Sequence, residues 1–230
     1  MLQRVLETEV MDTWEDALEY DAMDFTEVNT AFALRAKELG PPSGMVLDCG
    51  TGTARIPILI AHQNPNVRIV AIDLSLNMLK KGNANVADAG LTGAISVRRV
   101  DAKSLTFSNA SYDMLISNSL IHHLPDPLSF LKEINRVIKP YSGVLIRDLI
   151  RPDNLGIVDQ LVKKYAGDCN DRQQKLYRDS LHAAFTLKEA AEFLAASGIE
   201  GATVVQSSDR HWSIERRWSN FSRWKDHGSA

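Results

Sequence analysis

The chain has 230 residues, of which 44% are hydrophobic and 24% charged, and its net charge is -3. This length suits one domain with a sizeable core, and the slightly acidic charge offers no global attraction to nucleic acid or anionic membranes. Two cysteines exclude a disulfide framework, and no apolar run approaches the roughly 20 residues of a membrane span. We therefore expect a soluble, cytoplasmic protein with a single domain over residues 1–230.

The first 40 residues have a helical pattern, which Gly40-Pro41-Pro42-Ser43-Gly44 ends. After this stop, short runs rich in Val, Ile and Leu alternate with helical stretches. The expected strands are residues 45–49, 68–72, 94–100, 112–117 and 143–149. This alternation predicts an α/β fold with a doubly wound, mostly parallel sheet and helices on both faces.

Local signals mark the ends of the helices. Ser75 is placed to cap the helix after the second strand, and Asp126-Pro127 puts a cap before a proline in the first turn. The apolar face of that later helix extends to Ile138, and Pro140 stops it. Residues 186–189 fit a capping box.

Two strand-like runs, residues 202–206 and 211–214, follow the last predicted helix and are separated by a short polar turn. This pattern predicts a hairpin. The sheet should therefore have seven strands and finish with an antiparallel one.

A glycine turn follows the first strand. The apolar run ends at Asp48, Gly50 and Gly52 come next, and a helical pattern begins at once. Such a turn brings bare backbone against a ligand at the start of a helix. The second strand ends at Asp73, where a carboxylate can accept both hydroxyls of a ribose. Together these features predict a nucleoside-bearing cofactor across the ends of a parallel sheet.

Two classes of cofactor compete for this turn. A dinucleotide fingerprint needs a third glycine, but Arg55 stands at that position. Asp48 would also repel a pyrophosphate, whereas it suits a ligand with a free ammonium group. S-adenosylmethionine has that ammonium, and its carboxylate can meet the amides at a helix start. An NAD-dependent oxidoreductase stays as the alternative.

The later strand ends add to this prediction. Asp101 follows the third strand, where a carboxylate can accept from an adenine amino group. Leu74 and Met78 can flank the adenine ring, and Asn118 ends the fourth strand. Polar residues at four successive strand ends, in this order, indicate one ligand-binding edge.

Five motifs in residues 44–150 resemble the class I S-adenosylmethionine-dependent methyltransferases, and in particular the small-molecule group of ubiquinone and menaquinone biosynthesis. They are V-L-D-C-G-T-G-T, A-I-D-L-S, V-D-A-K, Y-D-M-L-I-S-N-S and R-V-I-K-P-Y-S-G. The resemblance implies that the cofactor's methionine part borders Asp48, Gly50, Thr51 and Gly52, its ribose Asp73, and its adenine Asp101 and Ala102. Tyr20 resembles an N-terminal tyrosine that closes over the cofactor.

Methyl transfer from a sulfonium is an in-line displacement with an activated donor, so few catalytic residues are needed. His122 and His123 follow the fourth strand, and either one can be a base or bind the acceptor. The alternative is that both histidines only pack beneath the cofactor. Adjacent histidines rarely face one ion and no further ligand pattern accompanies them, so we expect no metal.

Arg147 and Arg151 end the fifth strand, where they can hold an anionic acceptor or form structural ion pairs. The insertion that follows, about residues 153–185, has the pattern of two short helices. Insertions at this point commonly form a lid, so we expect acceptor contacts from Tyr165, Tyr177, Arg178 and His182.

The C-terminal residues 209–225 are basic and aromatic, a composition that can bind RNA. The alternatives are a packing extension of the last strand or a self-association surface that makes a homodimer. The acidic chain favours these over nucleic acid. The leading hypothesis is methyl transfer to a small-molecule acceptor, with S-adenosylhomocysteine as product. RNA methylation and a non-catalytic cofactor-binding module are the alternatives.

Overall fold

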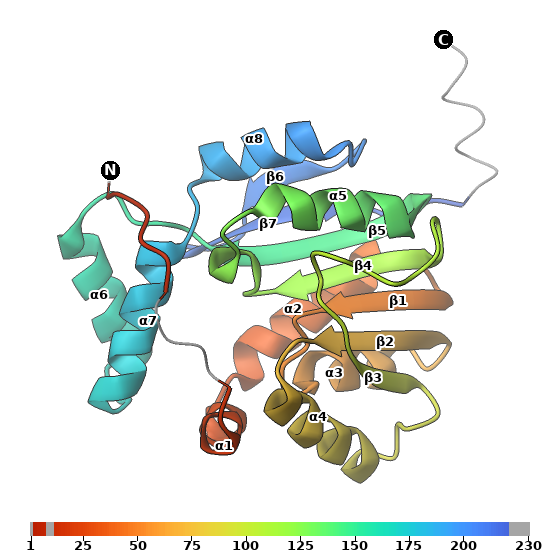
Figure 1. Cartoon of the computed structure of the whole chain (residues 1–230), viewed down its shortest axis with the longest axis horizontal. Helices are drawn as coiled ribbons and strands as arrows, with labels where there is room; N and C mark the ends of the chain where they lie inside the picture. Colours follow the sequence, from red (N-terminus) through yellow and green to blue (C-terminus); the bar gives the residue numbers. More distant parts are fainter. Residues whose placement is uncertain (1, 8–11, 221–230) are drawn as a thin grey trace.

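A computed structural model describes residues 2–7 and 12–220. Seven strands form one sheet in the order β3-β2-β1-β4-β5-β7-β6 (Figure 1). The strands are β1 (Gly44–Cys49), β2 (Val67–Asp73), β3 (Ile95–Arg99), β4 (Tyr112–Asn118), β5 (Ile138–Leu149), β6 (Thr203–Gln206) and β7 (His211–Arg216). The first five are parallel, and β7 runs antiparallel to both of its neighbours. The predicted sheet with its antiparallel C-terminal strand is confirmed.

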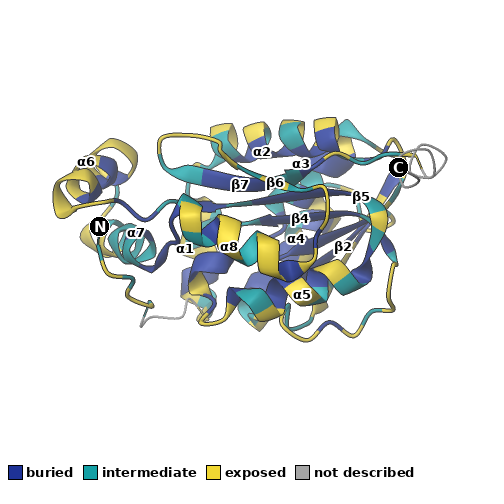
Figure 2. Cartoon of the chain, turned by 90° about the horizontal axis from the view of Figure 1, so that it is seen from above, coloured by how far each residue is buried: buried dark blue, intermediate teal, exposed yellow. Residues whose placement is uncertain are grey.

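Helices cover both faces of the sheet (Figures 1 and 2). One face carries α2 (Thr26–Leu39), α3 (Arg55–Gln63) and α4 (Leu76–Asp88), and the other carries α5 (Pro127–Val137) and α8 (Leu187–Ser197). The remaining helices lie at the end toward which the parallel strands run. These are α1 (Trp14–Ala22), the 3-10 helix η1 (Ile121–His123), α6 (Leu155–Ala166) and α7 (Asp171–Ala183). The helices α6 and α7 fall within the predicted insertion.

The core has two apolar layers, one on each side of the sheet. Phe130 and Ile134 belong to the layer on the face that α5 covers. Phe32 of α2 and Ile60 of α3 belong to the layer on the opposite face. Because both faces are covered, the central strands are continuous apolar runs rather than alternating ones (Figure 2). Their polar residues are therefore concentrated at the strand ends, where the site lies.

The predicted helix caps are present. Ser75 accepts a hydrogen bond from the Met78 amide at the start of α4, and Asp126 accepts from two amides at the start of α5. Thr186 and Glu189 form the predicted capping box of α8. These caps satisfy amides that have no intrahelical partner.

The fifth strand differs from its prediction. The helix before it ends at Val137, and β5 already begins at Ile138, which pairs with Tyr112. The register then shifts before Met114 pairs with Gly143. Pro140 lies in this irregular stretch, where its missing N–H disturbs no ladder. Proline thus marks a bulge in a strand, and not the stop of a helix.

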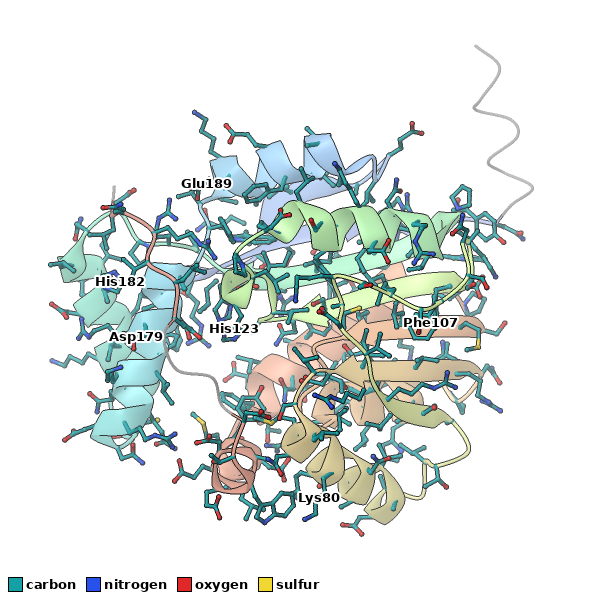
Figure 3. The ribbon with its side chains drawn as sticks, in the orientation of Figure 1. Lys80, Phe107, His123, Asp179, His182 and Glu189 are labelled. Atoms are coloured by element: carbon teal, nitrogen blue, oxygen red, sulfur yellow. The ribbon has the colours of Figure 1, made fainter. Side chains whose placement is uncertain are left out.

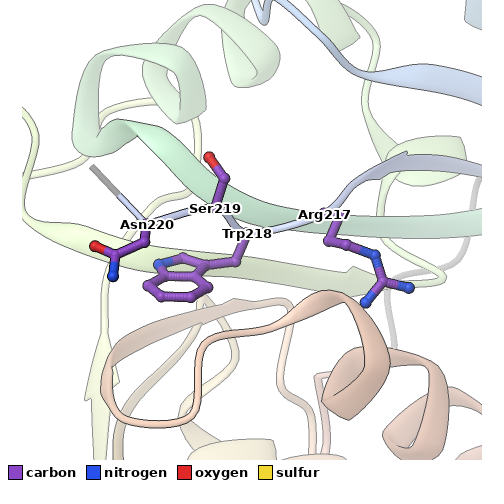
Figure 4. Close-up of a pocket in the computed structure, with 4 residues that line it drawn as sticks. All are labelled: Arg217, Trp218, Ser219 and Asn220. Atoms are coloured by element: carbon purple, nitrogen blue, oxygen red, sulfur yellow. The ribbon is translucent and has the colours of Figure 1, made fainter. Parts of the chain in front are cut away.

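The chain after β7 packs along the sheet end opposite the site. The Trp218 amide donates to the Leu39 carbonyl (2.7 Å), and residues 217–220 line a small surface pocket (Figure 4). Trp212 is fully buried in the core, and buried Arg216 donates to the Ser142 carbonyl. Trp212 and Arg216 therefore serve packing, while Trp224 and Lys225 lie outside the described residues. None of the described helices is both long and apolar enough to span a bilayer.

Candidate functional site

The glycine turn between β1 and α3 has the backbone that its sequence predicts. Gly50, Gly52 and Ala54 all have positive φ (75°, 55° and 61°). The amides of Gly50 and Thr51 both donate to the Ile72 carbonyl at 2.9 Å, which fixes the turn against β2. Left-handed backbone favours glycine at positions 50 and 52, since a side chain would be strained there, and Ala54 adopts the same conformation with a small side chain.

Asp73 ties the two strand ends together. One carboxylate oxygen accepts from the Gly52 amide (2.9 Å), and the other accepts from the Ser75 amide (3.0 Å). The carboxylate therefore lies at the junction of the glycine turn and the start of α4. This is the place where a ribose is expected in a nucleoside-binding sheet.

Asp48 is the clearest sign that this edge receives a cationic group. Its side chain is buried, and its Oδ2 atom makes no hydrogen bond to any described residue. Burial raises the pKa of Asp48 to about 7. A buried carboxylate oxygen without a hydrogen bond is costly, and the ammonium of a bound ligand would remove that cost. The residues present therefore fit an amino-acid-bearing nucleoside cofactor.

Tyr20 of α1 lies directly on the glycine turn. A Cβ atom added at Gly52 would be 3.5 Å from the Tyr20 ring, and burial raises the pKa of its hydroxyl. Arg55 holds the end of α1 in place, since it donates to the carbonyls of Asp21 (3.0 Å) and Met23 (2.8 Å). The bulky residue at the third glycine position thus has a structural use, which is to anchor α1 over the turn.

The remaining predicted cofactor residues line the same edge. Asp101 lies in the loop after β3, where its carboxylate pairs with Lys103 (2.9 Å). Leu74 is 54% exposed, an unusual state for a leucine beside the sheet, whereas Met78 is buried. Ala102 is partly buried against the core of the α5 face, and Asn118 ends β4. These residues lie near one edge of the sheet, as the sequence predicts. Their binding roles stay predictions.

The two histidines have different surroundings. His122 is buried, and its Nδ1 atom lies 2.6 Å from an Asp148 carboxylate oxygen, while its amide donates to the other oxygen (3.1 Å). Burial alone would lower the pKa of His122, but the Asp148 carboxylate outweighs it and the net pKa is raised. Asp148 thereby fixes the imidazole, and the Nε2 atom faces the Glu7 carboxylate at 3.7 Å.

His123 of η1 is half-exposed. It lies beside the N-terminal segment, near α7 (Figure 3). Its Nδ1 atom lies 2.7 Å from the Glu7 carboxylate, and the Ser180 hydroxyl of α7 also donates to Glu7. Ligand atoms of Glu7, His122 and His123 all lie within 4.8 Å of one another. The Glu7–His123 distance is that of a charge-assisted hydrogen bond, and the expected lack of a metal stays a prediction.

Residues 2–7 form a strap that joins α7 to η1. Arg4 donates to the carbonyls of His122 (2.9 Å), Leu124 (3.0 Å) and Ala183 (2.6 Å), and it lies over the Phe185 ring. Nothing in the sequence signals this strap or the role of Glu7, because both depend on contacts across more than 100 residues. Asp148 had a weak signal, since it is a charge within an apolar strand.

Arg147, near the end of β5, and Arg151, just after it, have different surroundings. Arg151 is buried and donates to both carboxylate oxygens of Glu189 (2.8 and 3.0 Å), so it forms a structural ion pair. Arg147 makes no such pair. Its Nε atom is buried without a hydrogen-bond partner, and its guanidinium lies 5.2 Å from the centre of the Phe32 ring.

Two of the four predicted lid side chains, Tyr165 and Arg178, are engaged elsewhere. Tyr165 donates to Asp209 of the β6–β7 turn (2.7 Å), and Arg178 pairs with Asp159 of α6 (2.6 Å). The His182 carbonyl accepts from the Val5 amide of the strap. Tyr177 packs partly buried against the α6–α7 core. The helices α6 and α7 are thus held by their own pairs, by the hairpin and by the strap.

Comparison with known proteins agrees with this geometry. Residues 42–212 match the family described as "Methyltransferase domain", and the chain therefore belongs to that family. It is 32% identical to a ubiquinone/menaquinone biosynthesis C-methyltransferase, UbiE, of Geotalea daltonii over 112 residues, which is 48% of each chain. It is 25% identical to the O-methyltransferase resE of Aspergillus sclerotiorum, over 73% of this chain and 65% of that one. The chain thus spans about half the length of the UbiE protein that it matches.

A solved structure shows the same fold. A SAM-dependent methyltransferase from Aquifex aeolicus superposes with a TM-score of 0.67 and 19% identity, over 88% of this chain and 97% of that one. The resemblance drawn from the strand-end motifs is therefore confirmed.

Proposed function

We propose that this protein transfers a methyl group from S-adenosylmethionine to a small-molecule acceptor. The proposal rests chiefly on the buried Asp48 carboxylate, whose Oδ2 atom has no hydrogen bond to a described residue, beside a left-handed glycine turn. Family membership and the printed names of the relatives support it.

The chain's own residues divide the work of binding. Asp48 holds the ammonium of the cofactor, the Gly50–Gly52 backbone lies against its amino-acid part, and Asp73 accepts from the ribose. Asp101 and Ala102 border the adenine, with Leu74 and Met78 flanking it. Tyr20 covers the turn and excludes water. When bound, S-adenosylmethionine supplies a methyl group already activated on a sulfonium.

His122 is the proton acceptor in this proposal. Asp148 holds its Nδ1 side, so a proton would be accepted at Nε2, which lies 3.7 Å from the Glu7 carboxylate. A base is needed only where the acceptor is protonated at the reacting atom, as a hydroxyl is. This arrangement favours an acceptor that is methylated at oxygen, and one relative is named as an O-methyltransferase.

The binding test uses S-adenosylhomocysteine and isothermal titration. We expect the wild type to bind it in the micromolar range and Asp73→Ala to weaken binding by roughly 1.5–3 kcal/mol, because charged hydrogen bonds are lost. Asp88→Ala, an exposed change at the end of α4, is the matched control. If folded Asp73→Ala binds like the wild type, the ribose assignment is wrong.

A cytoplasmic location is also part of the proposal, since Cys49 and Cys169 are both free. A homodimer through the C-terminal residues stays a prediction. RNA remains the alternative acceptor, although Trp212 and Arg216 are committed to packing.

A further inference from the structure

Arg147 stands in a row of polar residues at the carboxyl edge of the sheet. It pairs in register with Asn118 of β4 and Ser213 of β7. Directly paired residues point to the same face of a sheet, and so does the pair two residues earlier, Ile116 and Leu145, which belongs to the core on the α2 face. The three polar side chains therefore continue that face beyond the core, under α2.

The Arg147 guanidinium lies near a carboxylate that is already paired with another arginine. Its Nε atom is buried without a partner, and no hydrogen bond or ion pair joins its side chain to the described part of the chain. The carboxylate of Glu215 contributes to its electrostatic surroundings, but that group is already held by Arg35 at 2.5 Å. The Phe32 ring lies beside the guanidinium, and Arg147 as a whole is partly exposed.

The buried arginines Arg151 and Arg216 have partners for their terminal nitrogens, although Arg151 Nε also lacks one, whereas the side chain of the partly exposed Arg147 has no hydrogen-bond partner among the described residues. Arg151 is paired with Glu189, and Arg216 donates to Ser142 and to the Glu200 carbonyl. Burial lowers the pKa of Arg147, as it also lowers that of Arg216, so the geometry and not the pKa distinguishes Arg147. A partly buried cation whose Nε atom has no partner is stabilised when a ligand brings an anion to it.

We propose that Arg147 is an anion-binding subsite that holds a carboxylate or phosphate group of the methyl acceptor, so that the acceptor is a small organic acid. This inference rests on the proposed methyl transfer. The cofactor's own carboxylate is a poorer candidate. Its ammonium is assigned to Asp48 on β1, two strands away from β5, and two strand spacings are about 10 Å. The ammonium and carboxylate of one amino acid are bonded to the same carbon, so Arg147 could reach the cofactor carboxylate only with its side chain extended back toward β1, which titration with 5′-methylthioadenosine checks.

The first test measures thermal unfolding of the full chain without ligand. Arg147→Met keeps the packing against Phe32 but removes the charge, and we expect its midpoint to equal or exceed that of the wild type. Arg151→Met is the matched control and should lower the midpoint by several degrees, because it leaves Glu189 unpaired. If Arg147→Met loses as much stability as Arg151→Met, Arg147 is structural and the proposal is wrong.

The second test adds acetate or inorganic phosphate with S-adenosylhomocysteine present, at an ionic strength held constant with chloride. We expect either anion to raise the wild-type midpoint by on the order of 2 °C and to leave Arg147→Met unchanged. A larger response to acetate identifies a carboxylate acceptor, and a larger response to phosphate identifies a phosphorylated one. Equal responses of wild type and variant would overturn the subsite.

A third measurement separates acceptor from cofactor. S-adenosylhomocysteine and 5′-methylthioadenosine, which lacks the amino-acid part, are titrated into wild type and Arg147→Met. We expect both ligands to bind the two proteins equally. A loss on the order of tenfold for S-adenosylhomocysteine alone would assign Arg147 to the cofactor carboxylate and contradict an acceptor subsite. If S-adenosylhomocysteine binds neither protein, the proposed function fails, while the anion response without it still tests the subsite.

Discussion

Asp48 is the residue whose charge state controls the proposed site. Its pKa of about 7 means that the carboxyl is mostly neutral at pH 6 and mostly ionised at pH 8. A ligand ammonium is attracted only to the ionised form, so affinity should rise with pH through this range. We predict that S-adenosylhomocysteine binds about tenfold more tightly at pH 8 than at pH 6.

The check is isothermal titration across this pH range, with Asp48→Asn as the comparison. The variant has no titrating carboxyl at this position, so its affinity should be weak and nearly independent of pH. A variant profile with the same slope as the wild type would assign the effect to another group.

The buried His122–Asp148 pair gives a second prediction at this scale. Burial raises the pKa of Asp148 and the His122 charge lowers it, with a net lowering, so this carboxyl stabilises the fold above the pH range of an unfolded aspartate. That contribution is lost as pH falls through the lowered pKa. Asp148→Asn should cost about 3 kcal/mol at neutral pH and lower the pKa of His122.

Denaturant unfolding and NMR titration of the His122 ring measure these two effects. Asp209→Asn, a change at a half-exposed ion pair in the β6–β7 turn, is the control and should move neither. A His122 pKa unchanged by Asp148→Asn would remove Asp148 as its partner.

The sequence predicted some of these residues and not others. Asp48 and Asp73 follow apolar runs, and a carboxylate at a strand end is visible as a break in composition. Arg55 was noted only as an obstacle to a dinucleotide, because its anchoring of α1 depends on a contact more than 30 residues away. Glu7 gave no signal, since its partners His123 and Ser180 come together only in the fold.

At the scale of elements, α7 is joined to α1 across the carboxyl edge. Arg172 of α7 pairs with Asp16 (2.5 Å) and Glu19 (2.8 Å), both on the helix that places Tyr20 over the glycine turn. We predict that Arg172→Met speeds release of S-adenosylhomocysteine, because α1 can then leave the turn more easily. The free energy of unfolding should fall by less than about 1 kcal/mol, since this arginine is half-exposed.

Stopped-flow fluorescence measures that release, and Trp14 of α1, which lies under Lys80 of α4, is a natural probe. Arg178→Met is the matched control on the same helix, because it pairs with α6 instead of α1. Equal release rates in wild type and Arg172→Met would show that this contact does not gate the site.

Elements with local signals were predictable, and elements defined by distant pairing were less so. Capping residues placed the starts of α4, α5 and α8 correctly. The start of β5 was wrong because Ile138 continues the apolar helix pattern, and only its pairing with Tyr112 makes it a strand residue. A proline is compatible with either assignment when it lies at a bulge.

At the scale of the whole molecule, the parallel arrangement of β1 to β5 explains why polar residues are concentrated at one edge of the sheet. The carboxyl ends of β1, β2 and β4 meet there. The strand order reverses at β1, which lies between β2 and β4. A ligand crevice is expected at such a switch point. Three covering pieces, α1, the 2–7 strap and α7, lie at the same end (Figure 1).

The most direct test of the central claim is hydrogen–deuterium exchange with and without saturating S-adenosylhomocysteine. The proposed site predicts slower exchange in residues 46–54, 70–78 and 100–103, and unchanged exchange around the surface pocket at residues 217–220. Protection at residues 217–220 alone, or no protection in any of the three segments, would contradict the account.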